Sequence, residues 1–171
     1  MDVRCPSVAP RICRACPHAV LHAAGANLLW NDDVEGAARA FEIIVGDVDK
    51  GLTVPPSGTA AVLAALGSIY FQANFFPKAV KRFTQSLFLE NDPLSPRQRA
   101  ETLCNIGSAY HEMQQLEDAE KALTKALVIS RTLETSLKLT AKIMHNLAHI
   151  FYRHNHYLRA HDVFSEGKID I

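Results

Sequence analysis

The sequence predicts an all-α fold, a superhelical array of about four antiparallel helical hairpins. Three observations support this prediction. A small residue recurs about every 40 positions, apolar residues follow a helical spacing around it, and turn-forming residues separate the two helices of each pair. Repetition with this period is typical of solenoids, in which each hairpin buries its apolar face against its neighbours.

The composition fits a folded protein without a dominant charge. Of the 171 residues, 48% are hydrophobic and 21% are charged, and the 18 Lys and Arg balance the 18 Asp and Glu. A chain with a formal net charge of zero has no global positive field, so we expect no nucleic-acid partner. No apolar run approaches the ~18 residues needed to cross a bilayer, and we expect no membrane insertion.

The repeat is defined by Gly67, Gly107 and Ala148, with Gly25 as an earlier copy, at intervals of 42, 40 and 41 residues. Glycine inside a helix costs about 1 kcal/mol relative to alanine. Keeping a small residue there therefore predicts close approach by a second helix. Large apolar residues follow three and sixteen positions later, and an alanine follows twelve positions later: Leu28, Tyr70, Tyr110, Phe151; Phe41, Phe83, Leu123, Phe164; and Ala37, Ala79, Ala119, Ala160.

Turn-forming residues fall between the helices of each predicted hairpin. Asn74 and Asn155 favour turns, as does the Asn-Asp-Asp segment at 31–33. Pro77 suits the first turn of a helix, where its missing N–H costs little. An acidic pair at 117–118 suits the equivalent position in the next unit, because it faces the positive end of the helix dipole.

The order of small residue, aromatic, alanine and aromatic resembles the tetratricopeptide repeat, most clearly in "LGSIYFQANFFPKAVKRF" and "IGSAYHEMQQLEDAEKAL". "LAHIFYRHNHYLRAHDVF" follows the same frame, with Ala148 in place of the usual glycine. The resemblance covers about residues 18–168. It implies units at about 18–58, 60–99, 100–140 and 141–171, preceded by an irregular extension over 1–17.

The period of 40–42 residues exceeds the usual 34 of this family. In this respect the chain is similar to the long repeats of kinesin light chains, spindle-orientation adaptors and ciliary scaffolds. The resemblance implies a non-catalytic, cytoplasmic adaptor or structural subunit of a larger assembly, with a ciliary or axonemal assembly preferred. Arg4, Arg11 and Arg14 are also compatible with a mitochondrial presequence, but three prolines would break the helix that import requires.

Repeat arrays of this kind bind peptides along a concave face lined by the first helix of each unit. Ala64, Ser68, Ser108 and Asn146 are expected on that face, among other small or polar groups. The fourth unit adds a cationic and aromatic cluster to this face, which would suit an acidic stretch of a partner. A soluble receptor for an acidic peptide motif is therefore a second hypothesis, and an ordinary solvated helix face is the alternative to both. The candidate binding residues are Asn105, His111, Lys142, His145, His149, Tyr152 and Arg153.

The C-terminal edge is a second candidate interface. Val163, Phe164, Ile169 and Ile171 would meet water unless another helix covers them. An exposed apolar strip usually marks an interface. We therefore expect a partner chain or a second copy at this edge; the alternative is that the sequence is a piece of a longer repeat protein.

Metal binding and catalysis have less support in the sequence. Cys5, Cys13, Cys16 and His18 could supply four zinc ligands, but their spacing is irregular and a loose or partner-bound extension is preferred. We expect no cofactor. The chain carries no glycine-rich phosphate loop and no nucleophile elbow, so we expect no enzyme activity. Cys104 is expected to pack as a small hydrophobe.

Overall fold

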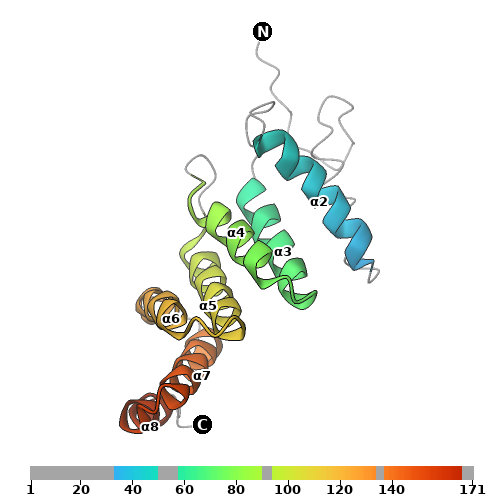
Figure 1. The fold of residues 1–171 in the computed structure, drawn as a ribbon. Coiled ribbons are helices and arrows are strands. Elements are labelled where there is room, and N and C mark those ends of the chain that lie inside the picture. Colours follow the sequence, from blue (N-terminus) through green and yellow to red (C-terminus); the bar gives the residue numbers. More distant parts are fainter. Residues whose placement is uncertain (1–32, 50–57, 90–93, 134–136, 167–171) are drawn as a thin grey trace. The chain divides into compact units, whose positions relative to one another are not determined.

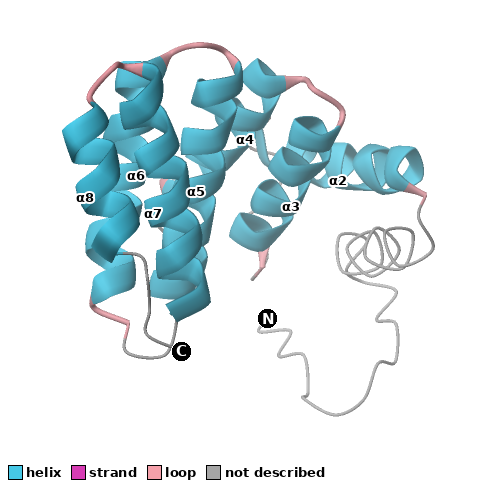
Figure 2. Ribbon diagram, turned by 90° about the horizontal axis from the view of Figure 1, so that it is seen from below, coloured by secondary structure: helices cyan, strands magenta, loops and turns pink. Residues whose placement is uncertain are grey.

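The computed structural model of the protein describes residues 33–49, 58–89, 94–133 and 137–166. The chain divides into two compact units, Met1–Pro56 and Ser57–Ile171. Figure 1 gives the order of the helices, α2 to α8. Throughout the described ranges the helices are joined by loops and turns, with no strand (Figure 2).

Helix α2 (Val34–Asp49) is the described part of the first unit. The Asp33 carboxylate accepts a hydrogen bond from the backbone N–H of Gly36 at 2.8 Å and so caps the first turn. Ala37, Ala40, Phe41 and Val45 are buried on one face of the helix. The burial of Ala37 and Phe41 agrees with their predicted repeat positions. Gly25 and Leu28, the earlier positions of the same repeat, lie outside the described residues.

The second unit consists of consecutive helix pairs, as the sequence predicted. The pairs are α3 (Thr59–Gln72) with α4 (Phe76–Leu87), α5 (Pro96–Glu112) with α6 (Leu116–Arg131), and α7 (Leu137–Arg153) with α8 (Tyr157–Glu166). Helix α4 also packs against α5, and α6 against α7, so each pair is joined to the next. The first helices contact one another as well, α3 with α5 and α5 with α7.

Two glycines set the separation of the helices within their pairs. A Cβ atom placed on Gly67 would lie 2.6 Å from the Phe83 ring, and one on Gly107 would lie 2.6 Å from Leu123 Cγ. Phe83 and Leu123 are buried, at 1% and 0% exposed. Each is the large residue sixteen positions after its glycine, so the predicted close approach is confirmed. The alanines twelve positions after each glycine, Ala79 and Ala119, are both 0% exposed.

The third pair departs from this arrangement. Its small residue is Ala148, which is fully buried and carries the methyl group that Gly67 and Gly107 lack. The residue sixteen positions on, Phe164, is 44% exposed and places its ring against His145, with 5.9 Å between the ring centroids. Of the described residues of α8, Ala160 is the one that is buried. The α7–α8 pair therefore shares less buried apolar surface.

The turns within the three pairs repeat the same backbone geometry. Asn74, Gln114 and Asn155 adopt left-handed φ angles of 62°, 60° and 60°. One residue later, the N–H donates to the carbonyl of the aromatic residue five positions back, at 2.8–2.9 Å in each turn. This arrangement satisfies carbonyls that the end of a helix would leave unpaired. The turn predictions at Asn74 and Asn155 are thus confirmed, whereas Gln114 was not anticipated because glutamine is no turn former.

Helix α5 begins at Pro96, before the expected start of its unit at about residue 100, because a strong capping signal precedes it. The Ser95 hydroxyl accepts from the backbone N–H of Gln98 at 3.4 Å, and the Gln98 side chain accepts from the N–H of Ser95 at 3.1 Å. Pro96 follows in the first helical position. This capping box fixes the helix start at Pro96, four residues before residue 100. The predicted placements of Pro77 and of the acidic pair at 117–118 in first turns are confirmed.

Replacing Gly107 by alanine should destabilise the second unit. The added Cβ would overlap Leu123, which is fully buried. Overpacking of this kind costs about 1–3 kcal/mol in the free energy of unfolding, less the ~1 kcal/mol that alanine gains in helix propensity. Urea denaturation would measure the change.

The matched control is Gly46→Ala in α2, where a Cβ would have nothing within 4 Å. That variant should be neutral or stabilised. Equal effects of the two substitutions would contradict the assignment of Gly107 as the point of helix approach.

Candidate functional site

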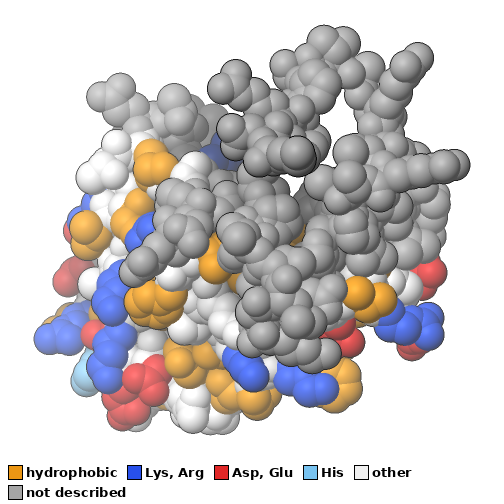
Figure 3. Space-filling model, turned by 90° about the horizontal axis from the view of Figure 1, so that it is seen from above, with side chains coloured by type: hydrophobic (Ala, Val, Ile, Leu, Met, Phe, Trp, Pro, Cys, Tyr) orange, Lys and Arg blue, Asp and Glu red, His pale blue; other side chains and the backbone are white. Residues whose placement is uncertain are grey.

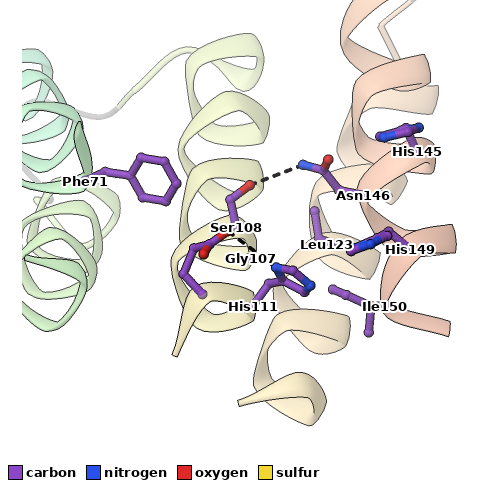
Figure 4. Close-up of a pocket in the computed structure, with 10 residues that line it drawn as sticks. Phe71, Gly107, Ser108, His111, Leu123, His145, Asn146, His149 and Ile150 are labelled. Carbon is purple, nitrogen blue, oxygen red and sulfur yellow. Dashed lines mark hydrogen bonds and ion pairs between the residues drawn. The ribbon is translucent and has the colours of Figure 1, made fainter. Parts of the chain in front are cut away.

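The candidate site is a pocket between α5 and α7, with a cavity of about 330 Å³. The two helices lie next to each other because the first helices of consecutive pairs are in contact. Figure 4 shows Ser108 and His111 on α5 facing Asn146 and His149 on α7, with Phe71 of α3 at one side. The full lining is Phe71, Gly107, Ser108, His111, Glu112, Leu123, His145, Asn146, His149 and Ile150.

A polar bridge joins the two helices at one side of the pocket. The Asn146 amide donates to the Ser108 hydroxyl at 3.2 Å and to Cys104 Sγ at 3.6 Å. The Ser108 hydroxyl in turn donates to the Cys104 carbonyl at 3.1 Å. Burial raises the pKa of the Cys104 thiol, against the opposing influences of Lys142 and Asn146. Cys104 is therefore a buried thiol that packs in the core, as the sequence suggested.

Three histidines gather in the pocket. The rings of His111 and His149 lie 4.9 Å apart between centroids, and His145 lies one helical turn before His149. His111 Nδ1 lies 3.6 Å from a Glu112 carboxylate oxygen, which is an ion pair only when the imidazole is protonated. The other nitrogen of this ring, Nε2, is buried without a hydrogen-bond partner among the described residues. The ring thus holds an unused donor or acceptor position.

The pKa of His149 is lowered from 6.5. Partial desolvation is the main cause, followed by the charges of His111, Arg153 and His145, and Glu112 acts in the opposite direction. All of these groups lie on α5 or α7. Because the charged imidazolium is disfavoured here, His149 is neutral above pH 6.5 and becomes protonated only at lower pH.

The structure places three of the seven predicted binding residues in the pocket and the other four outside it. His111, His145 and His149 line the pocket. Asn105 is half-buried on α5 and Lys142 is exposed on α7, both outside the lining. Two others lie at the C-terminal end of α7: the Tyr152 ring meets the Tyr157 ring at 5.4 Å, and the Arg153 guanidinium donates to Gln114 Oε1 at 2.6 Å. Only part of the predicted face thus forms one concave site.

Phe71 and Glu112 line the pocket but were not singled out from the sequence. Phe71 directly follows the repeat position Tyr70, and Glu112 directly follows the candidate residue His111 at the end of α5. The signal that could have found them is their position: Glu112 is one residue after His111 on α5, and Phe71 is three residues after Ser68 on α3.

The C-terminal edge is described in part. Val163 is half-buried and packs against the core of the α5–α8 helices, and Phe164 is exposed. Ile169 and Ile171 lie outside the described residues, as do Cys5, Cys13, Cys16 and His18 of the weak zinc candidate. Within the ranges that are described, no three His, Cys, Asp or Glu side chains are grouped to hold a metal ion. No helix in those ranges is long and apolar enough to cross a membrane.

The charged side chains do not collect by sign on the face shown in Figure 3. Lys and Arg lie among Asp and Glu there, with apolar side chains between them, in the part of that face formed by described residues. The sequence of the last helix pair is different: residues 137–161 contain no Asp or Glu, but contain Lys138, Lys142, Arg153 and Arg159. Positive charge is therefore concentrated on α7 and the start of α8.

The family profile described as tetratricopeptide repeat matches residues 98–167. Several solved structures have the same fold. The crystal structure of MamA is 17% identical with a TM-score of 0.66, over 84% of this chain and 71% of that one. A putative kinesin light chain of Podosopora anserina, with nearly identical TPR-like repeats, is 19% identical with a TM-score of 0.69, over 88% and 73%.

The apo form of RapI is 15% identical with a TM-score of 0.71, over 93% of this chain and 57% of that one. At these identities the likeness establishes the fold alone. The chain has no significant match among curated protein sequences. The family match and the fold together confirm the resemblance inferred from the repeat.

The polar bridge should contribute measurably to the attachment of α7 to α5. Asn146→Ala removes the donor to Ser108 and should lower the free energy of unfolding by about 1 kcal/mol. In a double-mutant cycle with Ser108→Ala, the coupling should be about 0.5–1.5 kcal/mol. Thermal and urea denaturation of the four proteins would measure it. Additive effects would mean that the two side chains do not interact.

Proposed function

Since residues 98–167 are tetratricopeptide repeats, which typically bind proteins and are not catalytic, we propose that this chain is a non-catalytic scaffold, an adaptor or structural subunit of a larger protein assembly. The observation that carries the proposal is the apolar surface of α8. Leu158 is 83% exposed, Tyr157 56% and Phe164 44%. Exposed apolar groups on one short helix mark a contact surface, and tyrosine is enriched at the centres of interfaces.

The internal repeat supports the same conclusion. Helix α4 packs against α5, and α6 against α7, so the second helix of each of these pairs is covered by a following helix. In the third pair, the exposed apolar side chains of α8 form the corresponding surface. We propose that a partner chain or a second copy covers this edge, with Phe164 and the half-buried Val163 in the contact.

The long period carries a narrower proposal, that the assembly is ciliary or axonemal and that the chain is otherwise cytoplasmic. Its basis is the 40–42-residue spacing alone. Microscopy of the tagged chain in ciliated cells tests it, and absence of the tag from the axoneme would remove this part of the proposal.

A second candidate function is a soluble receptor for an acidic peptide motif. The observation that favours it is the absence of Asp and Glu over residues 137–161, where Lys142 and Arg153 flank the pocket histidines. Cations that converge on one side of a groove attract carboxylates and fix their position. Such binding should weaken as salt rises, whereas apolar contacts at α8 should not.

For the scaffold, we expect affinity capture from native cells to recover partners in constant ratio at about 0.15 M and about 1 M salt. Leu158→Glu should deplete these partners, since it places a charge in the apolar contact. Val128→Glu is the matched control, because Val128 is an exposed apolar residue, at 63%, on α6. Equal recovery with both variants would exclude the α8 surface as the interface.

For the receptor, Arg153→Glu should weaken binding of acidic peptides by on the order of tenfold, measured by fluorescence anisotropy at low salt. Lys125→Glu on α6 changes the charge by the same amount away from the pocket and should have little effect. Loss of binding in both variants would indicate attraction by net charge and not a groove at α7.

A further inference from the structure

The pocket between α5 and α7 contains three imidazoles but no Lys or Arg side chain. His111 comes from α5, and His145 and His149 come from α7. His111 Nε2 is buried without a hydrogen-bond partner among the described residues. The centroids of the His111 and His149 rings are 4.9 Å apart. In the empty pocket, two charged rings at this separation would repel each other, so a state with both rings as imidazolium ions is disfavoured.

Five helices surround the histidine pair, and two of them, α3 and α6, contribute only the uncharged Phe71 and Leu123 to the pocket. Helix α5 supplies His111 and Glu112, and α7 supplies His145 and Arg153. From α8, the Phe164 ring lies against His145 and carries no charge. Glu112 is the one anion among these groups, and its carboxylate lies 3.6 Å from His111 Nδ1. The lining therefore has one carboxylate for three imidazole rings.

We propose that this pocket is a proton-linked carboxylate site, in which an Asp or Glu side chain of a partner binds between His111 and His149 as the pair takes up a proton. The proposal rests on the second candidate function, the receptor for an acidic motif, and adds its ligand group and its regulation. The carboxylate accepts from the protonated imidazole, and the proton comes from solvent.

The chemistry of the lining selects a carboxylate over a phosphate group. Phosphate sites use Arg forks or Lys charges, and neither lines this cavity. Glu112 would also repel a dianion more strongly than a monoanion. A cavity of about 330 Å³ accepts a carboxylate with its methylene stem, and Phe71 and Ile150 offer apolar surface for that stem. The Ser108–Asn146 bridge holds the two helices at the separation that the site needs.

The direction of the pH dependence follows from linkage. The pKa of His149 is lowered in the free protein and would be raised by a bound carboxylate. A ligand that raises a pKa binds more tightly as the pH falls through the interval between the two values. Affinity should therefore be lower at high pH and should increase as the pH falls toward the lowered pKa of the free His149, while a glutamate side chain stays ionised.

The test uses the full chain and a hexaglutamate peptide with blocked ends, with hexaglutamine as the neutral probe. Isothermal calorimetry at about pH 7.5 and pH 5.8, in buffers of different ionisation enthalpy, measures affinity and proton uptake together. We expect binding at the lower pH to be tighter by about tenfold, the factor for one pKa unit of coupling. His149→Gln should remove the pH dependence and the proton uptake. His149 is exposed, so this variant should fold normally, as circular dichroism would verify.

His161→Gln is the matched control, because it removes one exposed histidine of α8 that lies beside Asp162 and outside the pocket. It should bind as the natural chain does. Side-chain NMR gives an independent readout: the pKa of His149 should rise when hexaglutamate is added and should not change with hexaglutamine.

The remaining outcomes separate the two proposals. Hexaglutamate binding that is equal at both pH values, or that keeps its pH dependence in His149→Gln, would overturn the proton-linked site and leave the acidic-motif receptor standing. Hexaglutamate that binds no better than hexaglutamine at either pH would overturn both. Displacement of hexaglutamate by an equal concentration of inorganic phosphate would overturn the choice of a carboxylate.

Discussion

In the α3–α4 and α5–α6 pairs, a large apolar side chain of the second helix lies directly on a glycine of the first. Phe83 covers Gly67 and Leu123 covers Gly107, so closely that an added Cβ would stand 2.6 Å from the covering side chain. This contact sets how near the two helices come and which faces they turn to the next pair. Helix α7 in turn packs on both α5 and α6, and the pocket lies where α5 and α7 meet.

The fold could be predicted because its determinants are local and repeated. The glycine, the alanine twelve positions on and the large residue sixteen positions on occupy a constant register, and a helix buries such a register in only one way. Gln114 escaped prediction because its left-handed conformation is imposed by the turn, in which the equivalent positions hold Asn74 and Asn155. Tertiary packing there overrides the preference of the residue itself.

The site was harder to predict, since a helical register gives the face of a residue but not the depth at which it sits. His111, His145 and His149 were placed on the right face and do meet in one pocket. Tyr152 and Arg153 share the register but extend toward the end of α7, where they contact Tyr157 and Gln114. Phe71 enters from the preceding pair, and no spacing within α5 or α7 could have indicated it.

The methyl group of Ala148 affects which helix pair unfolds first. In a repeat array, each pair is stabilised by its own contacts and by those with its neighbours, so a weakly secured pair can unfold while the others remain folded. The α7–α8 pair lacks the close contact that glycine allows to Phe83 and Leu123, and Phe164 remains 44% exposed. Local unfolding should therefore begin in this pair. A ligand that bridges α5 and α7 would then suppress that opening, because it binds only the ordered form.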